Sequence, residues 1–409
     1  MAAVSIDRST GALLVDERVI FPLVLSNGPP AGSKAPSGND ALAEVAAGGA
    51  NFIRAGRPDW SLDSLDEQLA AERETLDAAA ANGLHCWLQL GNVPDLPERA
   101  PAAAEQLLTN LVGGLKDHPA LGAWKGLDEP ANPNRSARVP AARLERAYRK
   151  LKAVDPDHPV VITQAPIGTL AQLKPYRPAF DITGADIYPV SYPPGKHAGR
   201  RARDIGIVGA ITQKMVQAAG GKPVWMTLQV AWSGVIPSPQ HPNNVPRFPT
   251  LQQERFMAYQ AIVHGARGLS FFGGHLTQIA RPADAQLGWN WTFWGQVLQP
   301  LLGELTSDSV APALIAENAQ RAVQTRAPGV ELVTRQDADF VYVIAVRRRG
   351  GTSEVSFTGL PNRRNGRPLT GGEVLLEYEQ GTFRTVGAAN GRFRDWLGEH
   401  DARVYRFQR

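Results

Sequence analysis

The sequence contains few of the residues from which metal and redox sites are built. Cys86 is the only cysteine among 409 residues, which excludes an intrachain disulfide and a cysteine-based metal cluster. It lies in an apolar run, so we expect it to be a small core residue. No cluster of metal-ligand residues, no phosphate-binding Gly-rich loop and no nucleophile elbow is present. The sequence therefore predicts no metal and no cofactor.

Long apolar runs and a one-sided charge are also missing. No stretch is long and apolar enough to span a bilayer. The first ten residues lack the basic and apolar regions of an export signal, although an N-terminus from which such a signal had been removed would look the same. The compartment is thus open between the cytoplasm and, in the latter case, the periplasm or the medium. The net charge is +4, with both signs interspersed apart from short basic clusters such as residues 347–349. We predict no nucleic-acid partner and no membrane partner, and the sequence does not indicate an oligomeric state.

The composition that is present suits a large folded core. Apolar residues make up 43% of the chain and charged residues 20%, which argues against global disorder. A length of 409 residues exceeds the usual size of one domain. It fits one large barrel followed by a smaller module.

Short β-prone runs alternate with helix-like stretches over the first three-quarters of the chain. Such alternation predicts parallel strands joined by helical crossovers, and eight runs in roughly 300 residues fit a closed (β/α)8 TIM barrel. An open doubly wound sheet is the alternative, but it normally carries a Gly-rich first turn. The eight runs span residues 21–25, 50–56, 83–92, 121–130, 158–166, 180–190, 222–232 and 265–275. A last barrel helix is expected over residues 294–306.

The pattern changes from about residue 313. Residues 330–361, "VELVTRQDADFVYVIAVRRRGGTSEVSFTGLP", show apolar residues at a period of two with Gly at the turns. We predict a barrel domain over residues 1–312 and a small antiparallel β-sandwich over residues 313–409. Because polar chemistry is sparse in this segment, we expect a structural appendage rather than a carbohydrate-binding module.

Polar and aromatic side chains gather where the predicted barrel strands end, which is where (β/α)8 enzymes build their active sites. Amides and carboxylates bond hydroxyl groups, and aromatic faces stack on sugar rings, so the set predicts a carbohydrate as the partner. Trp289 follows the last strand and is, with Trp232, the preferred stacking residue. The expected substrate-binding residues are Asn27, Arg54, Gln89, Asn92, Gln164, Tyr188, Gln229, Trp232, His275 and Trp289. Simpler interpretations remain for some: Arg54 pairs with a barrel carboxylate, or Tyr188 serves only a turn.

The stretch "GAWKGLDEPAN", residues 122–132, joins a buried run to two adjacent carboxylates and a proline. One interpretation is a helix-capping acid on a surface loop. The other is a carboxylic acid that donates a proton at the mouth of a barrel. The position at the end of the fourth strand favours catalysis, with Glu129 as the general acid. Asp186 or Asp128 is then the second carboxylate, as a base or an orienting group.

Four segments together resemble a glycoside hydrolase of the (β/α)8 superfamily, over residues 18–306. They are "HPALGAWKGLDEP", "FDITGADIYPV", "KPVWMTLQVAW" and "HGARGLSFF". In the large retaining clan, called clan A, a strand-four glutamate is the acid/base, and Glu129 matches it. The residue before it is usually Asn and is Asp128 here. The clan's nucleophile is a strand-seven glutamate, and Gln229 stands in that place, so the resemblance does not carry over the ordinary double-displacement mechanism.

Three mechanisms remain open at this point. The first is inverting, with Glu129 as the acid and Asp186 as the base that activates water; inverting pairs stand about 6.5–9.5 Å apart and retaining pairs about 5–5.5 Å. The second follows a resemblance to the Asp-Glu pair of hexosaminidases of families 20 and 123, in which a 2-acetamido group is the nucleophile. There Asp128 would orient that group and Tyr188 would support the intermediate. The third uses a loop acid, Asp284 or Glu254. A non-catalytic carbohydrate-binding barrel is the rival interpretation.

Overall fold

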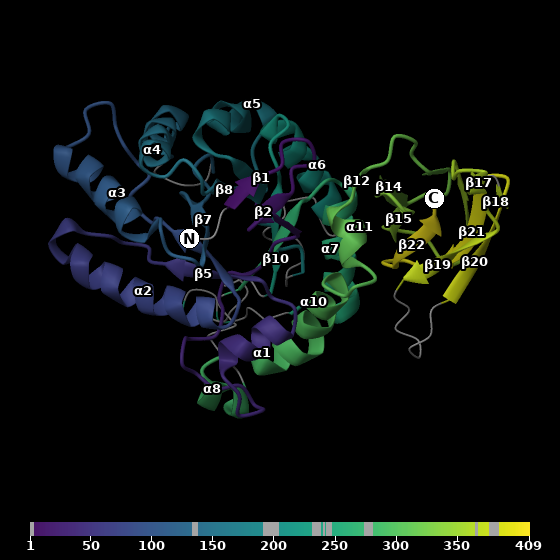
Figure 1. The fold of residues 1–409 in the computed structure, drawn as a ribbon, viewed down its shortest axis with the longest axis horizontal. Helices are drawn as coiled ribbons and strands as arrows, with labels where there is room; N and C mark the ends of the chain where they lie inside the picture. The colour runs from purple at the N-terminus through teal and green to yellow at the C-terminus, as the bar shows by residue number, and fades with distance from the viewer. Residues whose placement is uncertain are drawn as a thin grey trace.

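The computed structural model describes residues 4–132, 138–190, 204–230, 239, 242, 248–273, 281–364, 367–375 and 384–409. Two sheets organise the fold: a parallel eight-stranded sheet surrounded by helices, and a nine-stranded antiparallel sheet beside it (Figure 1). The predicted fold class, a (β/α)8 barrel followed by a β-sandwich, is confirmed. No helix within the described ranges is both long and apolar enough to cross a membrane.

The parallel sheet closes into a barrel. Its strands are β4 (Leu23–Leu25), β5 (Phe52–Gly56), β6 (His85–Gln89), β7 (Leu121–Lys125), β8 (Val160–Gln164), β9 (Ile182–Ala185), β10 (Trp225–Gln229) and β11 (Gly268–Phe272). Each falls inside one of the predicted runs. The order is β10-β11-β4-β5-β6-β7-β8-β9, and bridges from Thr183 to Val224 and from Asp186 to Thr227 join the two ends. Gly184 permits this closure, because a Cβ there would stand 1.6 Å from the carbonyl oxygen of Trp225.

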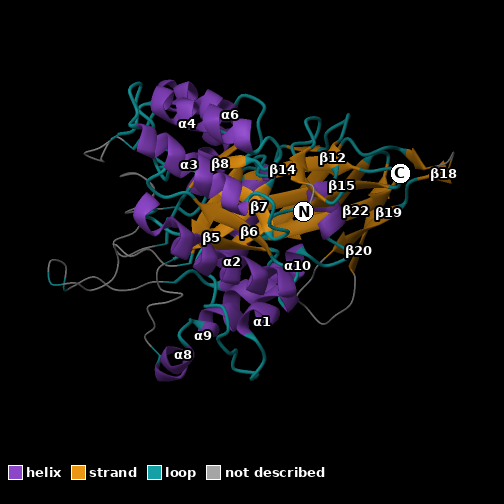
Figure 2. Cartoon of the chain, turned by 60° about the vertical axis from the view of Figure 1, so that its left-hand side comes forward, coloured by secondary structure: helices purple, strands orange, loops and turns teal. Residues whose placement is uncertain are grey.

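Helices cover the outside of the barrel strands (Figure 2). Most connect successive strands, and side-chain caps start several of them; Asp40, for example, accepts hydrogen bonds from the backbone of Leu42 and Ala43 at the start of the first helix. The predicted last helix is divided into a short π-helical segment and an α-helix that follows it. The helices are α1 (Ala41–Ala47), α2 (Leu65–Ala81), α3 (Ala102–Leu115), α4 (Ala141–Val154), α5 (Leu170–Leu173), α6 (Ile207–Ala219), α7 (Leu251–Val263), α8 (Pro282–Leu287), α9 (Trp291–Phe293), η5 (Trp294–Leu298), α10 (Gln299–Leu305) and α11 (Ala311–Ile315), with 3-10 turns η1 (Leu62–Ser64) and η2 (Lys174–Ala179).

A small N-terminal sheet closes one end of the barrel. It comprises β1 (Val4–Ile6), β2 (Leu13–Val15) and β3 (Arg18–Ile20), and it lies across the ring of strands in Figure 1. Its buried residues Val4, Leu13 and Val15 form one apolar cluster with inward-facing residues of the strands, among them Phe52 and Trp225. This end of the barrel, where the strands begin, is therefore sealed by apolar packing. The opposite end, where the strands finish, is left for a site.

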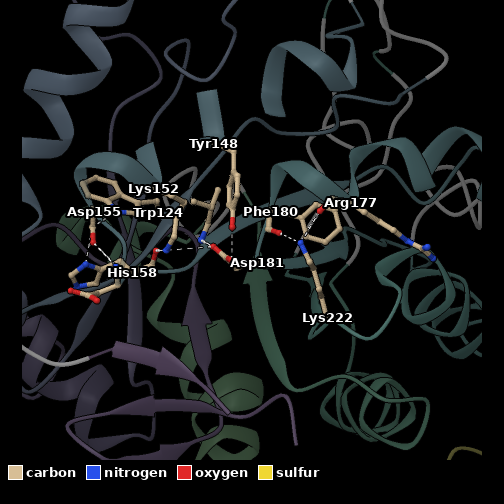
Figure 3. Close-up of polar contacts among 11 residues, drawn as sticks. Trp124, Tyr148, Lys152, Asp155, His158, Arg177, Phe180, Asp181 and Lys222 are labelled. Atoms are coloured by element: carbon tan, nitrogen blue, oxygen red, sulfur yellow. Dashed lines mark hydrogen bonds and ion pairs between the residues drawn. The ribbon is translucent and has the colours of Figure 1, made fainter. Parts of the chain in front are cut away.

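A polar network fixes the strands β7, β8 and β9 against helix α4 from outside (Figure 3). Asp155 accepts hydrogen bonds from the Trp124 indole (2.7 Å) and from the His158 ring (2.8 Å). Burial acts to raise the pKa of Asp155, but these hydrogen bonds outweigh it and hold that pKa below its usual value. The Tyr148 hydroxyl donates to Asp181, 2.8 Å away. Three of the barrel strands thus have a rigid outer support.

The antiparallel sheet folds over into two layers around its own core. Its strands are β12 (Glu317–Asn318), β13 (Gln324–Thr325), β14 (Val330–Gln336), β15 (Phe340–Arg347), β16 (Ser353–Thr358), β19 (Gly371–Leu375), β20 (Arg384–Ala389), β21 (Arg392–Leu397) and β22 (Ala402–Gln408), and a hairpin of β17 (Arg363–Arg364) and β18 (Arg367–Pro368) lies apart. Strand β20 pairs with β19 in one layer and with β21 in the other. The boundary between residues 312 and 313 stays a prediction.

The β-sandwich and the barrel share packing and buried charge. Tyr342, Ile344 and Val404 belong to the same apolar core as the barrel helices. Arg255 on α7 donates to both carboxylate oxygens of Glu304 (2.9 and 2.8 Å) and to the carbonyl of Ala402 on β22 (2.9 Å). A continuous core of this kind joins the two parts firmly.

Candidate functional site

Several predicted residues converge at the open end of the barrel. The set consists of Arg54 in the middle of β5, Asp128 and Glu129 after β7, and Asp186 and Tyr188 after β9. Asp186 interacts with Glu129 and with Asp128, and Tyr188 with all three of these carboxyl groups. Arg54 lies within electrostatic range of Asp128 and Tyr188. These five residues come from three different strands, as expected for an active site of this fold.

The backbone of Glu129 adopts an unusual conformation. Its φ angle is 46°, in the left-handed region that non-glycine residues rarely occupy. The backbone N–H of Glu129 donates to the Thr163 carbonyl on β8 (2.8 Å), and its carbonyl accepts from the Asn132 N–H (3.0 Å). The Asn132 side chain also donates to Oε2 of Glu129 (2.8 Å). The turn therefore holds the carboxyl group, which is only 7% exposed, in one place.

Glu129 and Asp186 form a hydrogen-bonded carboxyl pair. Asp186 is buried, and burial is the main reason that its pKa lies well above the usual value. The nearby charges of Glu129 and Asp128 and the hydrogen bond to Glu129 raise it further. Asp186 therefore keeps its proton to a higher pH than an ordinary aspartate, because its ionisation would place a further negative charge beside the neighbouring carboxyl groups without water.

Tyr188 completes the buried part of the cluster. Its hydroxyl is hydrogen-bonded to Asp186, and its ring stacks on Phe272 of β11 with centroids 5.9 Å apart. Burial, followed by the negative charges of Asp186, Asp128 and Glu129, raises the pKa of Tyr188. The phenol therefore remains a proton-bearing hydrogen-bond donor across the range in which enzymes usually work.

Lys125 is a site residue that sequence reasoning missed. It is the last residue of β7, its side chain is only 6% exposed, and its Nζ lies 2.8 Å from Asp128. The same ammonium sits over the Trp87 ring, 5.5 Å from the centroid. Ala123, two residues earlier on the same strand, faces inward, and side chains two apart on a strand share a face. This spacing is the signal that would have identified Lys125. Lys125 balances one charge of the carboxyl cluster.

Arg54 supplies a second cation near the same cluster. Burial lowers the pKa of its guanidinium, and the negative charge of Asp128 acts against that shift. The interpretation that Arg54 faces a barrel carboxylate agrees with this arrangement. Arg54, Lys125 and Asp128 together place opposite charges on the floor of the site.

Two predicted ligand amides are instead engaged by the protein backbone. Gln229 is fully buried, and both polar atoms of its side chain bond to the backbone of Val190 in the segment after β9. Asn92 accepts from the N–H of Trp60 (3.1 Å) and donates to its carbonyl (3.3 Å). The prediction of direct substrate contact is wrong for Gln229, whose side chain holds the segment that carries Asp186 and Tyr188. Asn92 fixes a turn.

Trp289 is also placed differently from the prediction. It is 0% exposed, its indole N–H donates to the Asn27 carbonyl (2.8 Å), and its ring packs against Trp291 and Trp294. It has no exposed face on which a sugar could stack, so that prediction is wrong. Trp291 and Trp294 are themselves buried packing residues.

The other predicted positions contribute less to the cluster. Gln164 is 1% exposed at the end of β8, and Gln89 is the last residue of β6. Asp284 accepts from the N–H of Thr292 (3.2 Å), and burial alone raises the pKa of Glu254. Neighbouring carboxyl groups help to raise the pKa of Asp186, but burial is the one cause that the described surroundings of Glu254 provide. Glu254 therefore stands apart from the pair of Glu129 and Asp186. Trp232 and His275 lie outside the described residues.

No group of three or more His, Cys, Asp and Glu side chains within the described ranges has the geometry to hold a metal ion. What the described cluster offers is acid–base chemistry: the Asp186 carboxyl with its raised pKa beside Glu129, a tyrosine donor, and two cations that limit the total negative charge. The contact between Glu129 and Asp186 is shorter than the gap expected for an inverting pair, which must leave room for a water molecule.

Comparison with known proteins identifies the fold but not a close relative. No protein-family model matches the sequence, and no curated protein matches it. Among solved structures, the chain is similar to a family 5 glycoside hydrolase from Bacteroides vulgatus, with 12% identity, a TM-score of 0.64, and coverage of 99% of this chain and 93% of that one. It is also similar to a family 30 endoxylanase from Clostridium papyrosolvens, with 11% identity, a TM-score of 0.53 and full coverage of both chains. A family 30 subfamily 8 xylanase from Clostridium acetobutylicum gives 11% identity and a TM-score of 0.55 over 95% of this chain and 96% of that chain.

Proposed function

We propose that the chain is a glycoside hydrolase that cleaves O-glycosidic bonds of an oligo- or polysaccharide. One observation carries the proposal: the hydrogen-bonded carboxyl pair of Glu129 and Asp186, buried beside Tyr188 where the barrel strands end. Burial raises the pKa of the Asp186 carboxyl, so a protonated carboxyl stands beside Glu129, and protonation of a poor alcohol leaving group needs such a proton source. The similarity in fold to solved glycoside hydrolases supports the proposal without naming a substrate.

In the proposed reaction Glu129 is the general acid. It transfers its proton to the glycosidic oxygen as the bond from that oxygen to the anomeric carbon breaks, so that the leaving group departs as an alcohol. Water then adds to the anomeric carbon and returns a proton to the Glu129 carboxylate. Asn132 and the backbone contacts of Glu129 keep the carboxyl group aimed during both steps.

The role of the second carboxylate follows from the contact between the two groups. Asp186, whose pKa is raised, is hydrogen-bonded to Glu129 and is too close to it to act across an intervening water. This favours the substrate-assisted route over the inverting one. In that route the 2-acetamido oxygen attacks the anomeric carbon as the bond to the leaving group breaks, with Tyr188 as a donor beside the developing ring. The water of the second step then displaces the acetamido oxygen from the anomeric carbon. Asp128, half exposed and held by Lys125, orients the acetamido N–H.

The experiment is a hydrolysis screen of aryl glycosides, including N-acetylhexosaminides, with the wild-type protein and Glu129→Gln in parallel. We expect turnover by the wild type and a loss of at least about 10²-fold in the variant, which keeps the shape of the side chain but has no proton to give. Preference for N-acetylhexosaminides supports the acetamido route. Equal activity of both proteins would refute the role of Glu129. Glycan binding without turnover by either protein would favour the non-catalytic barrel.

A further inference from the structure

The β-sandwich contains a large open groove that the proposed active site does not use. It has a volume of about 970 Å³ and lies over strands β19, β20 and β22 and the start of β15. Its size is within the range of small-molecule and oligosaccharide sites. This part of the chain was expected to be only a structural appendage, so the groove calls for an explanation.

The floor of the groove is bare backbone. Gly371 on β19 pairs directly with Gly387 on β20, and both residues line the groove. A Cβ built on Gly387 would find no atom within 4 Å, which shows that the space above it is open. Two facing glycines remove the side chains that normally cover the surface of a sheet, so a flat ligand can approach the strands closely.

One wall combines an aromatic ring with an anchored cation. The guanidinium of Arg406 lies over the ring of Phe340, 4.9 Å from its centroid. Glu373 holds the same guanidinium through two contacts, at 2.7 and 2.6 Å. The pair is neutral overall and rigid, because a guanidinium held by a carboxylate and an aromatic ring has little freedom left.

Three further lining residues offer neutral polar groups at the surface. Thr370, Thr385 and Gln408 are exposed and present two hydroxyls and an amide around the glycine floor. Among the described residues that line the groove, Arg406 is the one cation, and Glu373 balances it, so these residues offer no net charge to an anion. Hydroxyl and amide groups beside an aromatic edge are the partners of uncharged, hydroxyl-rich rings.

We propose that this groove binds a segment of neutral glycan and so tethers the polysaccharide on which the barrel acts. The glycan lies along the paired glycines, with a ring against Phe340 and hydroxyls on Arg406 and the threonines. Glycan binding in the groove does not depend on the proposed function. That the bound glycan is also the substrate of the barrel rests on that function. An extended peptide laid on the same strands is the competing occupant.

The test is affinity electrophoresis of the full chain in native gels that contain neutral probes: xylan, galactomannan, mixed-linkage glucan, starch or glycol chitin. The Glu129→Gln background prevents digestion of the gel and leaves the sandwich unchanged. Gly387→Leu fills the groove at a position where a side chain meets no neighbour. The matched control is Trp396→Ala, which removes a 60% exposed aromatic that does not line the groove.

We expect at least one probe to retard the parent and Trp396→Ala equally, and Gly387→Leu to bind that probe at least about tenfold more weakly. Unchanged thermal unfolding of Gly387→Leu shows that the loss is local. Retardation that survives Gly387→Leu, or no retardation by any probe, would overturn the proposal. Hydrolysis of small aryl glycosides by Gly387→Leu with Glu129 intact tests the barrel separately, because this substitution in the sandwich should leave turnover unchanged. A protein that hydrolyses aryl glycosides but shows no binding at the groove would contradict only the groove proposal. A protein that binds glycan at the groove but hydrolyses nothing would contradict only the proposed function.

Discussion

The two ends of the barrel use the same strands for opposite purposes. At the closed end Phe52, Ala123 and Ile182 face inward and pack against the N-terminal sheet. Two residues further along the first two of these strands, the inward positions are Arg54 and Lys125. The period of two in a strand keeps these side chains on the same face, so the change from apolar to charged occurs within one strand, over about 7 Å.

This difference teaches how a barrel supports a charged cluster. The apolar end provides the free energy that holds the strands together, and it lies directly beneath the charged end. Trp87 belongs to both: it stacks on Trp225, with centroids 6.4 Å apart, and it lies under the ammonium of Lys125. Stability and chemistry should therefore respond to different substitutions, and the following experiments test that separation.

The largest expected effect is at the closed end. Trp225→Ala removes a ring that is 2% exposed and stacked on Trp87, so the free energy of unfolding should fall by about 3–5 kcal/mol. Turnover per folded molecule should change little, because the carboxyl pair lies at the other end. Urea unfolding and activity at 10 °C measure the two quantities. A loss of turnover larger than the loss of folded protein would show that the ends are coupled.

The next effect is at the open end. Asp186→Asn keeps the shape of the side chain but removes the carboxyl proton that stands beside Glu129, so turnover should fall about 10²-fold while the midpoint of unfolding stays or rises. Because the pKa of Asp186 is raised, the wild type should lose activity on the alkaline side as this proton leaves, and that limb should move in the variant. The pH profile of kcat is the measurement. An unaltered profile would show that Asp186 is a packing residue only.

The smallest effect concerns a buried carboxyl outside the cluster. Burial raises the pKa of Glu254 in the folded state, so above about pH 4.3 the folded protein binds more protons than the unfolded chain and stability falls as pH rises. Glu254→Gln should therefore match the wild type near pH 4 and exceed it by about 1–2 kcal/mol at pH 8, with unchanged turnover. Unfolding curves at both pH values test this. A change in turnover would return Glu254 to the list of candidate nucleophiles.

The sequence predicts the barrel well because each strand and helix has a local pattern of apolar and polar residues. Each barrel strand is a short β-prone run, and the carboxylates after the fourth run are visible as such. The N-terminal sheet was not predicted, since its three strands of three residues each are too short to show a pattern. Lys125 lies in a run that the sequence shows only as an apolar strand. Whether its side chain points into the barrel depends on the strand register, which composition does not reveal.

The errors at Gln229 and Trp289 have one physical cause. Both residues lie where the predicted site residues gather. The sequence does not reveal which distant part of the chain their side chains will bond to. For Gln229 the partner is the backbone of Val190, thirty-nine positions earlier, and for Trp289 it is the carbonyl of Asn27. Long-range hydrogen bonds decide whether an amide or an indole supports the fold or meets a ligand, and they follow from tertiary structure alone.

The left-handed backbone of Glu129 sets selection for stability against selection for activity. A glycine at this position would relax the turn, since glycine has no Cβ to oppose a φ of 46°. The same exchange deletes the carboxyl group on which the proposed chemistry depends. Directed evolution for heat resistance without an activity screen would thus favour a more stable but inactive protein through exchanges at residue 129.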